Sequence, residues 1–349
     1  MGQLEFERSE LFREDDYASP HVESGRRLHG GMDAQGRYLS PRMRVRAPAI
    51  AAWTDALRDR GGDLMDTDSS LLAGIRYPSD AQLKLLLVEG LGRTFWNNLT
   101  VIGHIEARGR VLAEMKFSDF QNVAVEDVST RAVGHLHKGL LEAHGLDEGG
   151  EPEKGIGGHD AMWFALRDLA FGEVDYPEPI VPENIARPEG EEPPPPPIEA
   201  AYAGTIRFLL NLLLIEFRAE RSFAQTEQLL RDPELFTDRR EEAEHAAVLV
   251  DRIRQDERVH VDSLRLYLGE IRELNLKRTE GGTIPGSTLV DNYWDNLVHW
   301  ATVEQPRLAA EQQRSMMSER IAEHSEPERI QAAFDALEDT EPDPHAGPG

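Results

Sequence analysis

The chain has 349 residues, no cysteine and a formal charge of -26, from 64 Asp and Glu against 38 Lys and Arg. This acidity repels phosphate backbones and anionic lipid headgroups, so we expect neither nucleic acid nor a membrane surface as a partner. Without cysteine, disulfides, thiolate metal sites and cysteine nucleophiles are excluded, and any bound metal must have oxygen and nitrogen ligands.

The first part of the chain, residues 1–78, has no sustained helical period, because glycine and proline interrupt it repeatedly. One short helix is predicted at 48–60. We interpret the rest as an irregular arm on a helical body. The first residues are charged and lack the apolar segment of a secretory signal, which favours a cytoplasmic location.

From Ser79 onward the sequence predicts an all-α domain over residues 79–324. Ser79 to Gln82 have the pattern of a capping box, and apolar residues then recur at helical spacing to about Phe117. The longest apolar run, Ile206 to Phe217, is shorter than the roughly 20 residues that span a bilayer, so we interpret it as core. Further helices are predicted at 125–144, 160–171, 198–231, 238–277 and 290–324, and the acidic residues 325–349 are predicted to be disordered.

Residues 178–199 include five consecutive prolines, which exclude a helix or a central strand. A proline-rich chain is extended, rising about 3.1 Å per residue, so this segment can travel the length of a helix bundle. It is therefore predicted to be a crossover between two helical hairpins.

Carboxylates and histidine recur on the predicted helices in a pattern typical of metal ligands. Glu106 and Glu216 lie in the similar segments IEAR and IEFR, and Glu216 directly follows LLNLLLI. A carboxylate among such residues faces the interior, where it needs a partner or a metal. On the next predicted helix, Glu257 and His260 form a Glu-x-x-His pair on one face. Carboxylates can bridge two cations and imidazole adds a neutral nitrogen, so the pattern predicts a metal site.

Over residues 79–145 and 198–277 this pattern resembles the ferritin-like di-iron carboxylate superfamily. That family carries a Glu on the first helix, Glu-x-x-His on the second, a Glu on the third and Glu-x-x-His on the fourth. The resemblance implies a ferritin-like four-helix bundle with a long crossover between the second and third helices. It assigns as metal ligands Glu106, Glu142, Glu216, Glu257 and His260.

The second helix departs from the family pattern, because the residue three after Glu142 is Gly145 rather than histidine. A histidine at the neighbouring position would be out of phase by about 100° on an ideal helix. The candidates for the missing ligand are His135, His137, His144, through a distorted turn, and His159. We favour His159, because the preceding glycine pair lets the backbone approach closely.

Two further interpretations of these residues remain open. Glu220, one turn after Glu216, is either an extra ligand or a partner of the ligands. Glu-x-x-His alone is a weak signal, since it also occurs at Glu242 to His245. In a metal-free bundle the buried carboxylates would instead pair with arginine, for which the nearby candidates are Arg218, Arg221 and Arg254.

The resemblance implies a non-haem di-iron oxidase or oxygenase. Two iron ions, with manganese as the alternative metal, would activate dioxygen to oxidise a small organic substrate, and a separate donor would supply electrons. The arm and the predicted helix at 290–324 favour an enzyme over simple storage, because a storage subunit needs little beyond the bundle. The alternatives are a ferroxidase or metal store, and a metal-free helical scaffold. A homodimer through the helix with Trp294 and Trp300 is also compatible with the sequence.

Overall fold

A computed structural model describes residues 8–13, 15–73, 77–183, 185–187 and 196–338. These residues are mostly helical, which confirms the all-α prediction. The described parts of the predicted crossover, 178–183, 185–187 and 196–199, contain no helix or strand. The rest of that crossover and residues 339–349 of the predicted tail lie outside the described residues.

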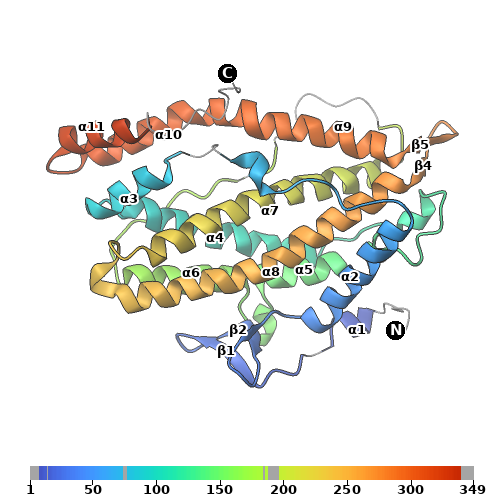
Figure 1. Cartoon of the computed structure of the whole chain (residues 1–349), viewed down its shortest axis with the longest axis horizontal. Helices are drawn as coiled ribbons and strands as arrows, with labels where there is room; N and C mark the ends of the chain where they lie inside the picture. Colours follow the sequence, from blue (N-terminus) through green and yellow to red (C-terminus); the bar gives the residue numbers. More distant parts are fainter. Residues whose placement is uncertain (1–7, 14, 74–76, 184, 188–195, 339–349) are drawn as a thin grey trace.

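The body of the molecule is built from long helices that lie side by side (Figure 1). Helix α7 (Ala200–Arg231) packs along α8 (Arg240–Glu273), and α6 (His159–Phe171) packs against both α4 (Arg93–Gly109) and α8. Helix α5 (Leu140–Gly149) contacts α4, and α5 and α6 follow one another behind α8. The two four-residue clusters of buried carboxylates and histidines described below come from these five helices.

The helix predicted at 79–117 is two helices, α3 (Asp80–Val88) and α4. The capping box at the start of α3 is confirmed: Ser79 Oγ accepts from the Gln82 backbone N–H, and Gln82 Oε1 accepts from the Ser79 backbone N–H. The chain turns between the two helices at Gly90, whose φ of 76° lies in the left-handed region that favours glycine. The predictions at 198–231 and 238–277 agree closely with α7 and α8.

The helix predicted at 125–144 is wrong. Most of that range is loop and a 3-10 helix (Ala132–Lys138), and α5 begins only at Leu140. The break is at Gly139, whose φ of 109° a continuous right-handed helix cannot contain. Helix α5 then runs past Gly145, beyond the end of the predicted helix at residue 144.

The arm is more regular than predicted. It contains α1 (Arg8–Leu11), a three-stranded antiparallel sheet of β1 (Ser19–Glu23), β2 (Arg26–Met32) and β3 (Tyr38–Leu39), and α2 (Met43–Asp59). The sheet lies against the bundle below α8 (Figure 1). It is joined to the loop between α5 and α6 by a bridge between Leu28 and Gly157, where the His29 N–H donates to the Gly157 carbonyl at 2.8 Å.

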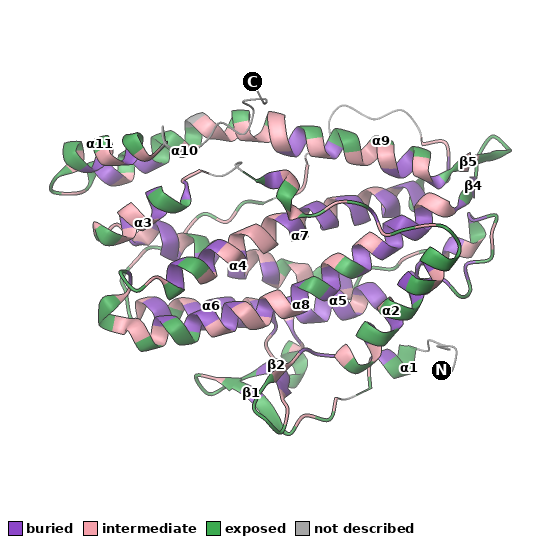
Figure 2. Ribbon diagram, viewed as in Figure 1, coloured by how far each residue is buried: buried purple, intermediate pink, exposed green. Residues whose placement is uncertain are grey.

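The C-terminal helices cover the opposite side. A hairpin of β4 (Asn275–Lys277) and β5 (Thr283–Pro285) leads into α9 (Gly286–His299), α10 (Gln305–Ala322) and α11 (Pro327–Glu338). The predicted disorder is wrong for α11, because Ile330 and Phe334 are fully buried in a cluster shared with Leu83 of α3. Figure 2 shows the contrast between these outer helices and the largely buried faces of α7 and α8.

Helix α7 is the one described helix long and apolar enough to cross a membrane by length and composition, but 56% of its apolar stretch is buried within the fold. A core helix of a soluble protein meets the same criterion.

Candidate metal centre

Carboxylates and imidazoles from five helices meet in the interior of the bundle. They form two groups of four residues, and within each group the ligand atoms lie within 4.8 Å of one another. Each of these side chains belongs to a residue that is at most 7% exposed. The members are Glu106 of α4, His144 and Glu148 of α5, His159 of α6, Glu216 of α7, and Glu257 and His260 of α8.

The first group consists of His144, Glu148, Glu216 and His260. Nε2 of His144 lies 3.0 Å from Oε1 of Glu216, and Nδ1 of His260 lies 3.2 Å from Oε1 of Glu148. His144 and Glu148 are four residues apart on α5, so both side chains leave the same face of that helix.

The second group consists of Glu106, Glu148, His159 and Glu257. Nδ1 of His159 lies 3.0 Å from Oε1 of Glu257, 3.6 Å from Oε2 of Glu106 and 3.7 Å from Oε1 of Glu148. Glu148 therefore belongs to both groups and lies between them. A single carboxylate in this position can serve two adjacent cations.

Gly145 explains why α5 carries no histidine at the position that the family pattern predicts. A Cβ atom at Gly145 would lie 2.5 Å from the backbone nitrogen of Ala113 and 2.8 Å from Cβ of Leu112. The face of α5 that holds Gly145 thus packs directly on the turn after α4, and only glycine fits there. The face of α5 that points into the cluster is the one that carries His144 and Glu148.

Burial and mutual interaction shift the pKa values of the cluster in opposite directions. Burial and the nearby Glu148 carboxylate raise the pKa of Glu106 well above its usual value, and burial with Glu257 does the same for Glu216. Burial also lowers the pKa of His144 to about 4, aided by the charge of His260. Without a metal, the buried carboxylates therefore cannot all be ionised at neutral pH.

Protonated histidines offset part of the remaining charge. Burial acts to lower the pKa of His260 and His159, but Glu257 and the other carboxylates around each ring together outweigh it and raise both pKa values well above the usual value. Burial acts to raise the pKa of Glu257, but the two histidines lower it to about 2. Such pairs of groups with opposed shifts are typical of functional sites.

Several atoms in the cluster have no hydrogen-bond partner among the described residues. They are Oε2 of Glu106, Nε2 of His144, Oε1 of Glu148 and Nδ1 of His159. Each of the four nevertheless lies within 3.7 Å of a carboxylate oxygen or imidazole nitrogen of another cluster residue, without hydrogen-bond geometry. Buried polar atoms are rarely left in this way, and cations bound by the two groups would satisfy all four. The donor set therefore fits one or two metal ions with oxygen and nitrogen ligands.

Two aspartates lie behind the histidines. Asp147 accepts a hydrogen bond from Nε2 of His260 at 3.1 Å, and Asp256 lies 3.3 Å from Nε2 of His159. Nε2 of His29 approaches Asp256 to 3.0 Å, although neither ring nitrogen of His29 has hydrogen-bond geometry with a described residue. Residues His29, His159 and Asp256 together form a third group close enough to hold an ion.

Of the residues proposed from the sequence, six lie in the cluster and two do not. The six are Glu106, His144, His159, Glu216, Glu257 and His260. Glu142 requires correction, because its carboxylate faces outward and pairs with Arg8. Glu220 is half-buried and belongs to neither group. Placing Glu142 in the cluster depended on a helix phase that the break at Gly139 changes.

The remaining histidine and arginine candidates lie away from the ligand atoms. His135 packs its ring on Trp53, 5.3 Å between centroids, and His137 lies 3.9 Å from Asp119, so neither faces the cluster. Arg218 donates to the Ile185 carbonyl, and Arg254 pairs with Glu227.

Sequence reasoning missed four residues: Glu148, Asp147, Asp256 and His29. The spacing from His144 to Glu148 places both on one helix face and could have identified Glu148. Asp256 directly precedes the recognised Glu257. His29 is on a strand of the arm, and no local pattern brings it to the bundle.

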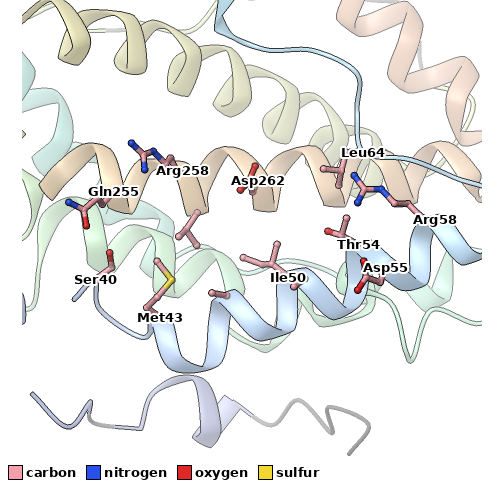
Figure 3. A pocket seen from close by; sticks show the side chains of 13 residues that line it. Ser40, Met43, Ile50, Thr54, Asp55, Arg58, Leu64, Gln255, Arg258 and Asp262 are labelled. Atoms are coloured by element: carbon pink, nitrogen blue, oxygen red, sulfur yellow. The ribbon is translucent and has the colours of Figure 1, made fainter. Parts of the chain in front are cut away.

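A groove of about 570 Å³ opens between α2 and α8 (Figure 3). Arg258, Val259 and Asp262 line it from α8, whereas Glu257 and His260 leave the other side of the same helix. A molecule in this groove is separated from the cluster by the helix itself. The groove is thus distinct from the candidate metal centre.

Comparison with known proteins yields no match to a family model, to a curated protein or to a solved structure.

Proposed function

We propose that this chain is a ferritin-like di-metal carboxylate protein that acts as a non-haem oxidase or oxygenase. The observation that carries the proposal is the position of Glu148 between two groups of ligands. Glu148 with His144, Glu216 and His260 would hold one ion, and Glu148 with Glu106, His159 and Glu257 the other. A bound iron pair, or manganese as the alternative, would pass electrons to dioxygen and so oxidise a small organic substrate, with a separate electron donor restoring the reduced metals.

The arrangement of ligands supports the ferritin-like comparison. Glu148 is near the end of α5 and His159 begins α6, with residues 149–158 between them. These two helices follow one another behind α8 (Figure 1). Glu148 and His159 therefore act as a Glu-x-x-His pair whose two intervening residues have been replaced by a loop. With Glu106, Glu216, Glu257 and His260 they complete the family's set of four carboxylates and two histidines, and His144 is additional.

Charge also favours two divalent ions. The four ligand carboxylates carry four negative charges when ionised, and two divalent ions would balance them. Beyond this set, the two negative charges of Asp147 and Asp256 equal in number the two positive charges of Arg42 and Arg46, both of which are buried and pair with Asp147. A buried centre that is neutral overall avoids the large desolvation cost of net charge.

The protein's own groups prepare the site for this role. Burial of every ligand excludes bulk water, which strengthens the electrostatic interaction with a bound cation. Neutral Glu106 and Glu216 would lose their protons when metal enters, since a metal ligand must be deprotonated. Asp147 and Asp256 hold the outer ring nitrogens of His260 and His159, which leaves the inner nitrogens directed at the cluster.

A metal-free scaffold is the competing function, and the short contacts between His144 and Glu216 and between His260 and Glu257 favour it. Oxygen uptake tests the enzyme directly. Protein loaded with iron, reduced without oxygen and then exposed to it should consume oxygen, and Glu148→Ala treated identically should not. Equal uptake by the two proteins would contradict the proposal. Wild-type protein that binds iron tightly and consumes no oxygen would contradict the oxidase function but not the metal site.

A further inference from the structure

The arm reaches the centre at two points, one on β3 and one at the start of α2. Tyr38 of β3 donates its hydroxyl to Oδ2 of Asp256 at 2.8 Å, and Arg46 of α2 pairs with Oδ2 of Asp147. Both aspartates in turn contact a histidine of the cluster through Nε2. Two series of contacts therefore run from the arm to the centre, and each reaches one of the two candidate metal positions.

We propose that the arm is the outer shell of the metal centre, in which Arg42 and Arg46 orient His260 through Asp147 and Tyr38 orients His159 through Asp256. The inference rests on the proposed function and adds positioning residues outside the four-helix bundle. A histidine that ligates a metal commonly donates its other ring N–H to a carboxylate, which fixes the ring and its tautomer. Here each of those carboxylates is fixed in its turn by the arm.

The first series of contacts, from Arg42 and Arg46 through Asp147 to His260, is held by two buried guanidinium groups. Arg42 is 9% exposed and Arg46 is 6% exposed, and both pair with Asp147, which is 1% exposed. Asp147 is thus a fixed anion that can accept from His260 at 3.1 Å.

Arg42 has an unusual backbone conformation in support of this contact. Its φ of 56° lies in the left-handed region, which is strained for a residue other than glycine. The backbone N–H of Arg42 donates to Asp15 at 2.6 Å, and its side chain reaches Asp147. Ser40 and Met43, on either side of Arg42, both line the groove of Figure 3, so α2 is not packed flush on α8 there. The two arginines therefore anchor the first turn of α2.

The second series of contacts, from Tyr38 through Asp256 to His159, carries a different charge. Tyr38 is a neutral donor, and Oδ1 of Asp256 has no hydrogen-bond partner among the described residues. Asp256 also has no arginine paired with it among those residues, in contrast to Asp147. Each series of contacts therefore affects its own metal position. Loss of one series should leave the metal position of the other series unchanged.

Conservative variants test the inference through metal binding rather than activity. Tyr38→Phe removes one hydroxyl, and Arg46→Gln removes one charge. Tyr202→Phe is the matched control for the first, because it is a buried tyrosine whose hydroxyl donates to the Asp119 carbonyl. Arg44→Gln is the control for the second, because Arg44 is exposed on the same helix and faces Asp16. Circular dichroism and thermal unfolding of the metal-free proteins establish that each variant is folded.

Anaerobic titration with Co²⁺, read by its visible spectrum and by elemental analysis, gives the affinity and geometry of each position. We expect Tyr38→Phe and Arg46→Gln each to lower the affinity for one of the two ions by about 10- to 100-fold and to alter the spectrum of that ion. The control variants should bind both ions as wild type does. In a Glu216→Ala background, which retains the ion beside His159, only Tyr38→Phe should weaken binding further.

Three results would overturn the inference. Wild-type protein that binds two ions, with folded variants indistinguishable from their controls, would refute the role of the arm and leave the proposed function intact. A third ion that is lost in His29→Ala would show that Asp256 is a ligand rather than an orienting group. Wild-type protein that binds no metal would refute the proposed function and the inference together.

Discussion

The imidazole rings of His144 and His260 are stacked, with centroids 3.7 Å apart and planes inclined by 13°. They come from α5 and α8, which are separated in sequence by the whole of α6, the crossover and α7. Two charged imidazoles at this distance would repel, and the opposed pKa shifts leave His144 neutral while His260 is protonated. The pair is therefore suited to share one cation through Nε2 of His144 and Nδ1 of His260.

Metal binding should strengthen as the pH rises. In the metal-free protein the pKa values of His159, His260, Glu106 and Glu216 are all raised, so these groups hold protons at neutral pH. A metal ion must displace those protons, and at lower pH the competition is stronger. Calorimetric titrations in buffers of different ionisation enthalpy should detect proton release on binding. An affinity independent of pH between 6 and about 8 would contradict this expectation.

Substitution of Gly145 should disturb α5 and the centre together. An added Cβ would clash with the backbone of Ala113, so Gly145→Ala is expected to cost about 1–3 kcal/mol of unfolding free energy. It should also weaken metal binding, because His144 is the adjacent residue. Gly204→Ala on α7 is the control, since nothing lies within 4 Å of its added Cβ. Urea unfolding measures the stability of both variants, and equal stability would contradict the close packing of α5.

Glu142 should be dispensable for metal binding. Its carboxylate pairs with Arg8 at the surface, and an exposed pair of this kind contributes about 0–1 kcal/mol. Glu142→Ala should therefore bind metal as wild type does and lose little stability. Loss of either ion in this variant, measured by elemental analysis, would show that the sequence-based assignment of Glu142 was right and its outward position wrong.

Glu270, which belongs to neither group of the candidate metal centre, should make the stability of the fold depend on pH. It is fully buried, its carboxylate accepts the Val133 N–H at 2.9 Å, and burial raises its pKa from 4.5 to about 7. Between these values the unfolded chain releases the proton before the folded chain does, so stability falls as the pH rises, by about 3 kcal/mol in total. Glu270→Gln should remove this fall and be more stable than wild type at pH 8. Urea unfolding at pH 5 and pH 8 would contradict the expectation if the variant kept the wild-type slope.

Much of the cluster could be predicted where its side chains lie on long, regular helices. Glu216 and Glu257 were identified because α7 and α8 keep one helical phase over many turns, so spacing fixes which side chains share a face. Glu142 was misassigned because the phase of α5 is set by the left-handed Gly139, and a single residue with positive φ resets the helix after it.

The outer residues could not be predicted, because their contacts join segments with no local relation. Tyr38 and Asp256 are 218 residues apart, and Arg42 reaches Asp147 from a left-handed backbone position that an arginine rarely adopts. The arm was interpreted as irregular since glycines interrupt its helical period, but Gly25 and Gly36 lie in turns of a small sheet, and Gly30 and Gly31 lie within its strand β2. Local sequence patterns contain no information on such tertiary contacts.

Elemental analysis of iron-loaded wild-type protein, Glu148→Ala and the control Glu142→Ala most directly tests the assignment of Glu148 to both metal positions. Wild type and Glu142→Ala should each contain about two ions per chain. Glu148→Ala should lose both, because the single carboxylate of Glu148 serves both positions. Wild-type protein without stoichiometric metal, or folded Glu148→Ala that retains two ions, would contradict that assignment.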